Sequence, residues 1–164
     1  MSKNRGCGAQ PVRVWVHYAQ FYLADPDLST DDLPGPEDAA DGILALGADG
    51  GCIRTGLHTG YIHVTVHAHT AASAPAPAPE GTEVGAEGDF HSSTGHLTVH
   101  SWEDGSIDEL PDLAAAGPGR YHLRLTAQGR ALGRQVDSCA PDAPVIESYV
   151  LETWPLPERV RGSG

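Results

Sequence analysis

Alternation of apolar and polar positions dominates the chain and predicts a protein built from β-strands. In residues 61–69 the apolar Ile62, Val64 and Val66 alternate with polar or amphipathic side chains. A period of two places the apolar side chains on one face of a strand and the polar ones on the other. Strands are expected at eight segments: residues 12–18, 42–46, 51–57, 61–69, 83–90, 97–102, 120–125 and 147–154.

Turn residues separate these segments and favour antiparallel pairing. Residues 47–51, Gly-Ala-Asp-Gly-Gly, predict a hairpin turn, and Thr59 with Gly60 predicts a second one. The 20 glycines and 13 prolines leave little room for long helices, and no helical period recurs along the chain. The predicted fold class is therefore all-β, an antiparallel β-sandwich of about eight strands with little helix.

The length of 164 residues suits a single domain. We expect a disordered N-terminal tail at residues 1–11, one sandwich domain at 12–154 and a C-terminal tail at 155–164. Residues 71–81 are rich in alanine and proline, a composition typical of a stiff polyproline II loop.

Charge is distributed very unevenly. The formal net charge is −12, and residues 14–119 hold one basic residue, Arg54, against 17 acidic ones, a formal charge of −16. Such a surface repels phosphate backbones and anionic lipid, so direct nucleic-acid binding and membrane binding are disfavoured. No apolar leader or long apolar run is present, and the expected location is the cytoplasm.

An acidic segment at residues 25–41 has no lysine or arginine. A loop of this kind can meet an arginine-rich surface without internal ion pairs, and we expect it to bind a basic protein partner. The alternative is that the acidic surface only keeps the protein soluble. The candidate partner-binding residues are Asp25, Asp27, Asp31, Asp32, Glu37, Asp38 and Asp41.

Histidines provide the alternative candidate site. His63, His67 and His69 lie on one face of one expected strand, and His100 lies on another. If these strands were neighbours, the imidazoles could hold zinc or another divalent transition metal. The competing interpretation is that they are surface residues, because no metal signature with a matching carboxylate is present.

Catalytic motifs are absent from the sequence. It contains no G-x-S-x-G elbow and no phosphate-binding G-x-x-x-x-G-K-[ST] loop. Glu103 and Asp104 lie in turn-like sequence and are expected to be solvated. Trp15, Trp102 and Trp154 fall on the outward parity of their strands, where loops can cover them or an acidic rim can make them protein-binding anchors.

Several short segments resemble the competence protein J family, the inhibitors of the DNA-entry nuclease. They are Val-Trp-Val-His-Tyr-Ala-Gln-Phe-Tyr-Leu at 14–23, Ala-Asp-Gly-Ile-Leu-Ala-Leu at 40–46, Tyr-Ile-His-Val-Thr-Val at 61–66, Pro-Gly-Arg-Tyr-His-Leu-Arg-Leu at 118–125 and Glu-Ser-Tyr-Val-Leu-Glu at 147–152. The resemblance covers about residues 12–154 and implies a compact β protein that binds and blocks a nuclease. The Thr-Gly-Leu-His-Thr-Gly segment at 55–60 is also similar to uncharacterised actinobacterial proteins.

Together, the charge and the resemblance favour a non-enzymatic acidic protein-binding module without a cofactor. Its expected role is that of a nuclease inhibitor or an immunity-type protein. The alternative function is a histidine-based metal-binding protein or a small metal-dependent enzyme.

Overall fold

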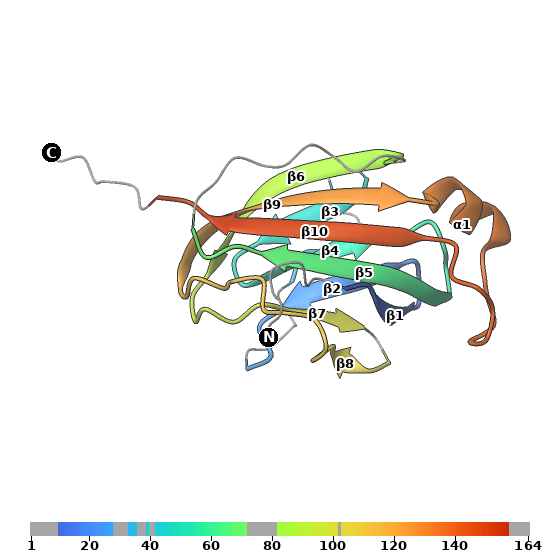
Figure 1. Ribbon diagram of the computed structural model, residues 1–164, viewed down its shortest axis with the longest axis horizontal. Coiled ribbons are helices and arrows are strands. Elements are labelled where there is room, and N and C mark those ends of the chain that lie inside the picture. The colour runs from blue at the N-terminus through green and yellow to red at the C-terminus, as the bar shows by residue number, and fades with distance from the viewer. Residues whose placement is uncertain are drawn as a thin grey trace, which may run out of the picture.

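The computed structural model describes residues 10–27, 33–35, 39, 42–71, 82–101 and 103–157. Within these ranges the chain forms ten strands and one short helix (Figure 1). In chain order the elements are β1 (Val12–Val16), β2 (Gln20–Ala24), β3 (Leu44–Gly47), β4 (Gly50–Arg54), β5 (Gly60–Ala68), β6 (Val84–Ser92), β7 (Thr98–Ser101), β8 (Gly105–Ser106), β9 (Gly119–Gln128), α1 (Arg130–Val136) and β10 (Ser148–Pro155).

The strands form two sheets of five, which confirms the predicted all-β sandwich. Sheet A has the order β1-β5-β10-β9-β6, and sheet B has the order β3-β4-β2-β7-β8. Figure 1 shows sheet A in front of sheet B, with α1 at one end. The expectation of purely antiparallel pairing needs one correction, because β10 runs parallel to β5. These two strands are far apart in sequence, so no short turn dictates their relative direction.

The core lies between the sheets and follows the sequence alternation. On β5 the side chains of Ile62, Val64 and Val66 are buried, while the residues between them point to the outer face. Phe21 and Leu23 on β2 meet this layer from sheet B, and Phe21 packs edge-to-face against Tyr149. Burial of these apolar side chains is the main driving force for bringing the two sheets together.

The turn between β1 and β2 was not predicted, and β2 was missed as a strand. Tyr18 and Ala19 adopt φ angles of 58° and 57°, a left-handed conformation that is uncommon for residues other than glycine. The Ala19 amide donates to His58 O at 3.0 Å, and the Thr55 amide donates to Ala19 O at 2.8 Å. Tertiary hydrogen bonds thus support a turn that transfers the chain from sheet A to sheet B.

The predicted hairpin at Thr59 and Gly60 is wrong. β4 belongs to sheet B and β5 to sheet A, so residues 55–59 cross between the sheets. The buried Glu147 carboxylate accepts hydrogen bonds from the amides of Gly56 and Leu57, each at 2.8 Å. The hairpin predicted at residues 47–51 is confirmed, because β3 and β4 pair antiparallel across it.

The helix α1 packs over the same crossover. A Cβ atom at Gly133 would lie 2.0 Å from Glu147 Oε1, so only glycine lets the helix approach this closely. Tyr149 donates to Glu147 Oε2 at 2.6 Å, and burial, followed by the charge on Glu147, raises the pKa of Tyr149 well above its ordinary value. No helix in the described part of the chain is long and apolar enough to cross a membrane.

Candidate functional site

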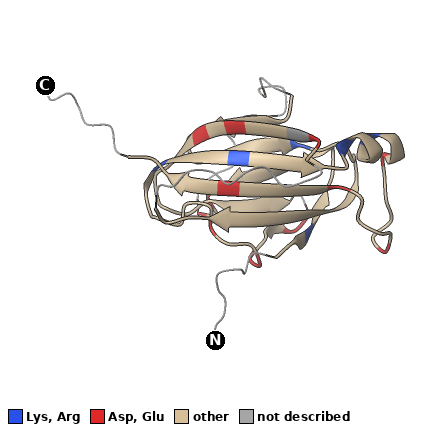
Figure 2. Ribbon diagram, turned by 45° about the horizontal axis from the view of Figure 1, so that its top comes forward, with Lys and Arg blue, Asp and Glu red and all other residues tan. Residues whose placement is uncertain are grey.

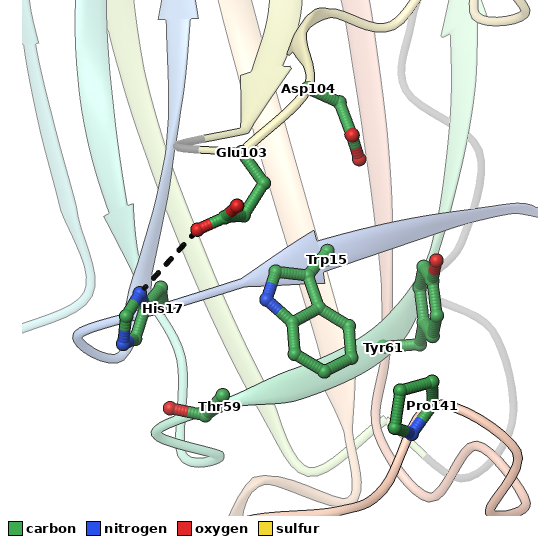
Figure 3. A pocket seen from close by; sticks show the side chains of 7 residues that line it. All are labelled: Trp15, His17, Thr59, Tyr61, Glu103, Asp104 and Pro141. Carbon is green, nitrogen blue, oxygen red and sulfur yellow. Dashed lines mark ion pairs between the residues drawn. The ribbon is translucent and has the colours of Figure 1, made fainter.

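An open hollow of about 420 Å³ lies beside the outer face of sheet A, where β1 and β5 meet the β7–β8 turn. We call it the Trp15 hollow. Figure 3 shows the Trp15 ring at its centre, with Glu103 and Asp104 above it, His17 and Tyr61 to either side, and Thr59 and Pro141 below. The lining residues are Trp15, His17, Thr59, Tyr61, Glu103, Asp104 and Pro141.

Strand pairing positions the two aromatic rings of the hollow. Trp15 on β1 is the direct partner of Tyr61 on β5, and their ring centroids lie 4.9 Å apart at an interplanar angle of 78°. The Arg13 guanidinium carbon lies 4.0 Å from the Tyr61 ring centroid, and Arg13 Nη2 donates to Pro141 O at 2.6 Å. The Tyr61 ring therefore already holds a cation, a favourable cation–π arrangement.

Two carboxylates form the rim. Glu103 has 58% of its side chain exposed, and its Oε2 lies 4.0 Å from His17 Nδ1. Asp104 is exposed, and its backbone amide donates to Ser101 Oγ at 2.9 Å, which fixes the turn. An exposed acidic rim over aromatic rings is suited to binding a cation or a basic side chain.

The exposed aromatic surface continues onto the β1–β2 turn. Tyr18 is 60% exposed. Its ring stacks on His17 with centroids 4.2 Å apart and meets His58 edge-on at 5.8 Å. Since His17 also lines the Trp15 hollow, the turn and the hollow form one continuous surface.

The structure places only part of the predicted acidic loop. Asp25 is 1% exposed and accepts hydrogen bonds from the Thr94 hydroxyl and from the Asp27 amide, the latter at 2.8 Å. Asp25 therefore joins the start of this segment to the connection between β6 and β7 and does not present its carboxylate to a partner, contrary to expectation. Asp27 is exposed. The other predicted residues lie outside the described part of the chain: Asp31, Asp32, Glu37, Asp38 and Asp41.

The four candidate metal ligands do not come together. His63 and His67 lie on the outer face of sheet A, whereas His100 lies on β7 in sheet B, on the face opposite the buried Val99. The sandwich core therefore separates them. His69 Nε2 instead lies 2.8 Å from Glu152 Oε2. The residues that the structure describes contain no group of three or more histidine, cysteine or acidic side chains able to hold a metal ion.

Charged side chains on β6, β9 and β10 form a second surface, which we call the paired face: Glu87, Asp89, His122, Arg124 and Glu152. Figure 2 shows acidic and basic bands facing one another across these strands. His122 Nδ1 and Nε2 each lie 2.7 Å from a carboxylate, of Asp89 and Glu87 respectively. Burial lowers the pKa of His122, but the two hydrogen bonds and the negative charges outweigh it and raise the pKa above its ordinary value. Arg124 donates to Glu152 at 2.9 Å.

Comparison with known proteins bears on the fold. No family model matches the chain, and no curated protein does so either. The crystal structure of ComJ, the inhibitor of the DNA degrading activity of NucA from Bacillus subtilis, is similar with a TM-score of 0.57 and 14% sequence identity. That similarity covers 91% of this chain and 98% of ComJ. The chain has a ComJ-like fold.

A second solved structure shares the ComJ-like fold. The protein of crocagin biosynthetic gene J is similar with a TM-score of 0.50 and 15% identity, over 90% of this chain and 97% of the other. The predicted resemblance to competence protein J is thus confirmed at the level of fold. The likeness to actinobacterial proteins stays a prediction.

The sequence indicates parts of the Trp15 hollow but not that they meet. Its alternation predicts that Trp15 faces outward, and its turn residues predict that Glu103 and Asp104 lie in a turn. The register that sets Trp15 against Tyr61, and the approach of the β7–β8 turn, come from tertiary pairing between distant segments. The outward parity of a tryptophan was the one signal in the sequence that pointed to this site.

Proposed function

We propose that this protein binds a basic nuclease and inhibits it. The observation that carries the proposal is the ComJ-like fold, which extends over nearly the whole length of both chains. ComJ is described as an inhibitor of the DNA degrading activity of NucA. A shared scaffold makes protein binding the first function to test, although one fold can serve several functions.

The charge of the chain supports a basic partner. A nuclease attracts the phosphates of its substrate with positive charge, and a protein of formal net charge −12 can be drawn to the same surface. Within this proposal, the acidic loop supplies contacts through residues other than the buried Asp25. Those residues are Asp27, Asp31, Asp32, Glu37, Asp38 and Asp41.

The direct test is inhibition of DNA degradation. The purified protein is titrated into NucA, and separately into any nuclease encoded beside its gene, with plasmid DNA as substrate. We expect inhibition to saturate near one inhibitor per nuclease and to weaken as salt rises, because steering by charge is screened. No inhibition and no complex at low salt with any of these enzymes would refute the proposal.

A charge-matched pair of variants tests the loop. Asp27→Asn combined with Asp31→Asn removes two loop charges, while Asp108→Asn combined with Glu109→Gln removes two charges from an exposed turn elsewhere. If the loop contacts the nuclease, the first variant should slow association more than the second, as measured by surface plasmon resonance. Equal slowing would show that only net charge matters.

A further inference from the structure

We infer that the Trp15 hollow is a binding site for an arginine side chain supplied by a protein partner. The inference deepens the proposed function and rests on it, because a basic enzyme carries arginines on its surface. It is distinct from the acidic loop, since it uses β1, β5 and the β7–β8 turn.

The rings provide a flat apolar surface on which a guanidinium can stack. Arg13 shows the preference within this same cluster, because its guanidinium carbon lies 4.0 Å from the Tyr61 ring centroid. That contact occupies Tyr61, whereas Trp15 forms the middle of the open hollow (Figure 3). Tryptophan is the ring that attracts cations most strongly. The guanidinium of an incoming arginine can therefore stack on Trp15 while Arg13 stays on Tyr61.

The rim carboxylates provide the charge. Among the residues that the structure describes, Glu103 forms one ion pair, with His17 at 4.0 Å, which is longer than a hydrogen bond, and Asp104 forms none. Both are ready to accept hydrogen bonds from an incoming cation. Arginine fits better than lysine, because its planar group can stack on the ring and donate to two carboxylates at once.

The surroundings of the hollow suit a protein partner more than a free amino acid. Tyr18, 60% exposed on the adjoining turn, extends the aromatic surface beyond the hollow. Tryptophan, tyrosine and arginine dominate the energetically important positions of protein interfaces. The hollow would receive the arginine, and the turn would contact the polypeptide that carries it.

The test uses a defined probe, the blocked tripeptide acetyl-Gly-Arg-Gly-amide, titrated into the full-length protein. Binding is followed by the indole N–H signal of Trp15 in two-dimensional NMR spectra, assigned with Trp15→Phe. We expect a saturable shift with the arginine peptide, at least about threefold weaker binding of the lysine analogue, and no saturable shift with the uncharged citrulline analogue.

Variants of the rim complete the test. Glu103→Gln combined with Asp104→Asn should weaken binding of the arginine peptide at least about fivefold. The control Asp108→Asn combined with Glu109→Gln removes the same charge from exposed residues outside the hollow and should change it less than about twofold. Equal binding of the three peptides, equal effects of the two double variants, or no saturable shift at Trp15 would each overturn the inference.

The nuclease assay separates this inference from the proposed function. If the wild-type protein inhibits a nuclease and the rim variant inhibits it equally well, the hollow is not the contact site and the proposed function stands. If the arginine peptide binds but no nuclease is inhibited, the hollow binds arginine and the proposed function is wrong.

Discussion

Two tryptophans on the outer face of sheet A have opposite surroundings. Trp154 on β10 is 7% exposed, and the rings of His122 and His69 lie with centroids 5.4 Å and 6.3 Å from it. Those histidines are held in turn by carboxylates of the paired face. Trp15 on β1 lines an open hollow instead. The same residue type on the same sheet is a covered structural element in one place and a candidate anchor in the other.

Carboxylates differ between the two regions in the same way. Those of the paired face have histidine or arginine partners at 2.7–2.9 Å, whereas the two on the rim of the Trp15 hollow have no such close partner among the described residues. Hydrogen-bonded charges are already compensated and contribute less to attracting a partner. The count of 22 acidic residues therefore overstates the number of carboxylates available for binding.

Truncation of Trp154 should give the largest effect on stability. Trp154→Ala removes a nearly buried ring and is expected to lower the free energy of unfolding by about 3 kcal/mol, measured by urea denaturation. The folded variant should still bind the arginine peptide like wild type. If the variant lost peptide binding under conditions where it is folded, Trp154 would also contribute to binding, and the distinction between a structural Trp154 and a binding Trp15 would be wrong.

Truncation of Trp15 should act mainly on binding. Trp15→Ala is expected to weaken nuclease binding about 30-fold, the cost of losing an interface anchor, with a smaller loss of stability than Trp154→Ala because Trp15 is only half-buried. Isothermal titration calorimetry and urea denaturation measure the two quantities. A larger stability loss than that of Trp154→Ala would identify Trp15 as a structural residue.

Removing one carboxylate from the paired face and one from the rim of the Trp15 hollow compares a hydrogen-bonded carboxylate with one that has no close partner among the described residues. Glu152→Gln removes the carboxylate that pairs with both Arg124 and His69, in surroundings where the Arg124 and Glu152 side chains are only 15% and 13% exposed. We expect a loss of about 1–2 kcal/mol in unfolding free energy. Glu103→Gln should change it by less than about 0.5 kcal/mol, as is usual for an exposed position. Equal losses would mean that the rim carboxylate is also structurally engaged.

The smallest expected effect is the contribution of His122 to the pH dependence of stability. This contribution makes the protein more stable at lower pH, whereas acid usually destabilises a folded protein. Because the folded pKa of His122 is raised, its protonated form stabilises the fold below the unfolded pKa of about 6.5, and this contribution is lost as pH rises through the folded pKa. His122→Gln should therefore destabilise the protein more at pH ~6 than at pH ~8.5. Urea denaturation of both proteins at both pH values measures this. A constant difference would show that His122 is not held as a cation.

Much of the fold could be read from alternation because the sandwich has one buried and one exposed face on most strands. On β5 the alternation assigned Ile62, Val64 and Val66 to the core, and all three are buried, whereas Ala68 at the end of the strand is partly buried. β2 was not predicted as a separate strand, because the segment from Val16 to Gln20 contains no glycine, proline or asparagine to indicate a turn. Tyr18 and Ala19 form that turn with positive φ angles, supported by hydrogen bonds to residues far along the chain.

The candidate site was less predictable than the fold. Asp25 was expected on an exposed acidic surface, but it is buried and its carboxylate accepts a hydrogen bond from the Thr94 hydroxyl. The histidines were expected to converge if their strands were neighbours, yet β5 and β7 belong to different sheets. Both outcomes depend on which distant strands pair, and an alternating pattern says only which face of a strand is apolar.

The sequence by itself determined that this chain forms a β-sandwich, which side chains of most strands enter the core, and that the formal net charge is −12. These properties follow from local alternation and from composition. Tertiary structure decided which acidic residues are compensated and which tryptophan lines an open hollow. That decision required the register of Trp15 against Tyr61 and the approach of the β7–β8 turn, because a binding surface is made from segments that only folding brings together.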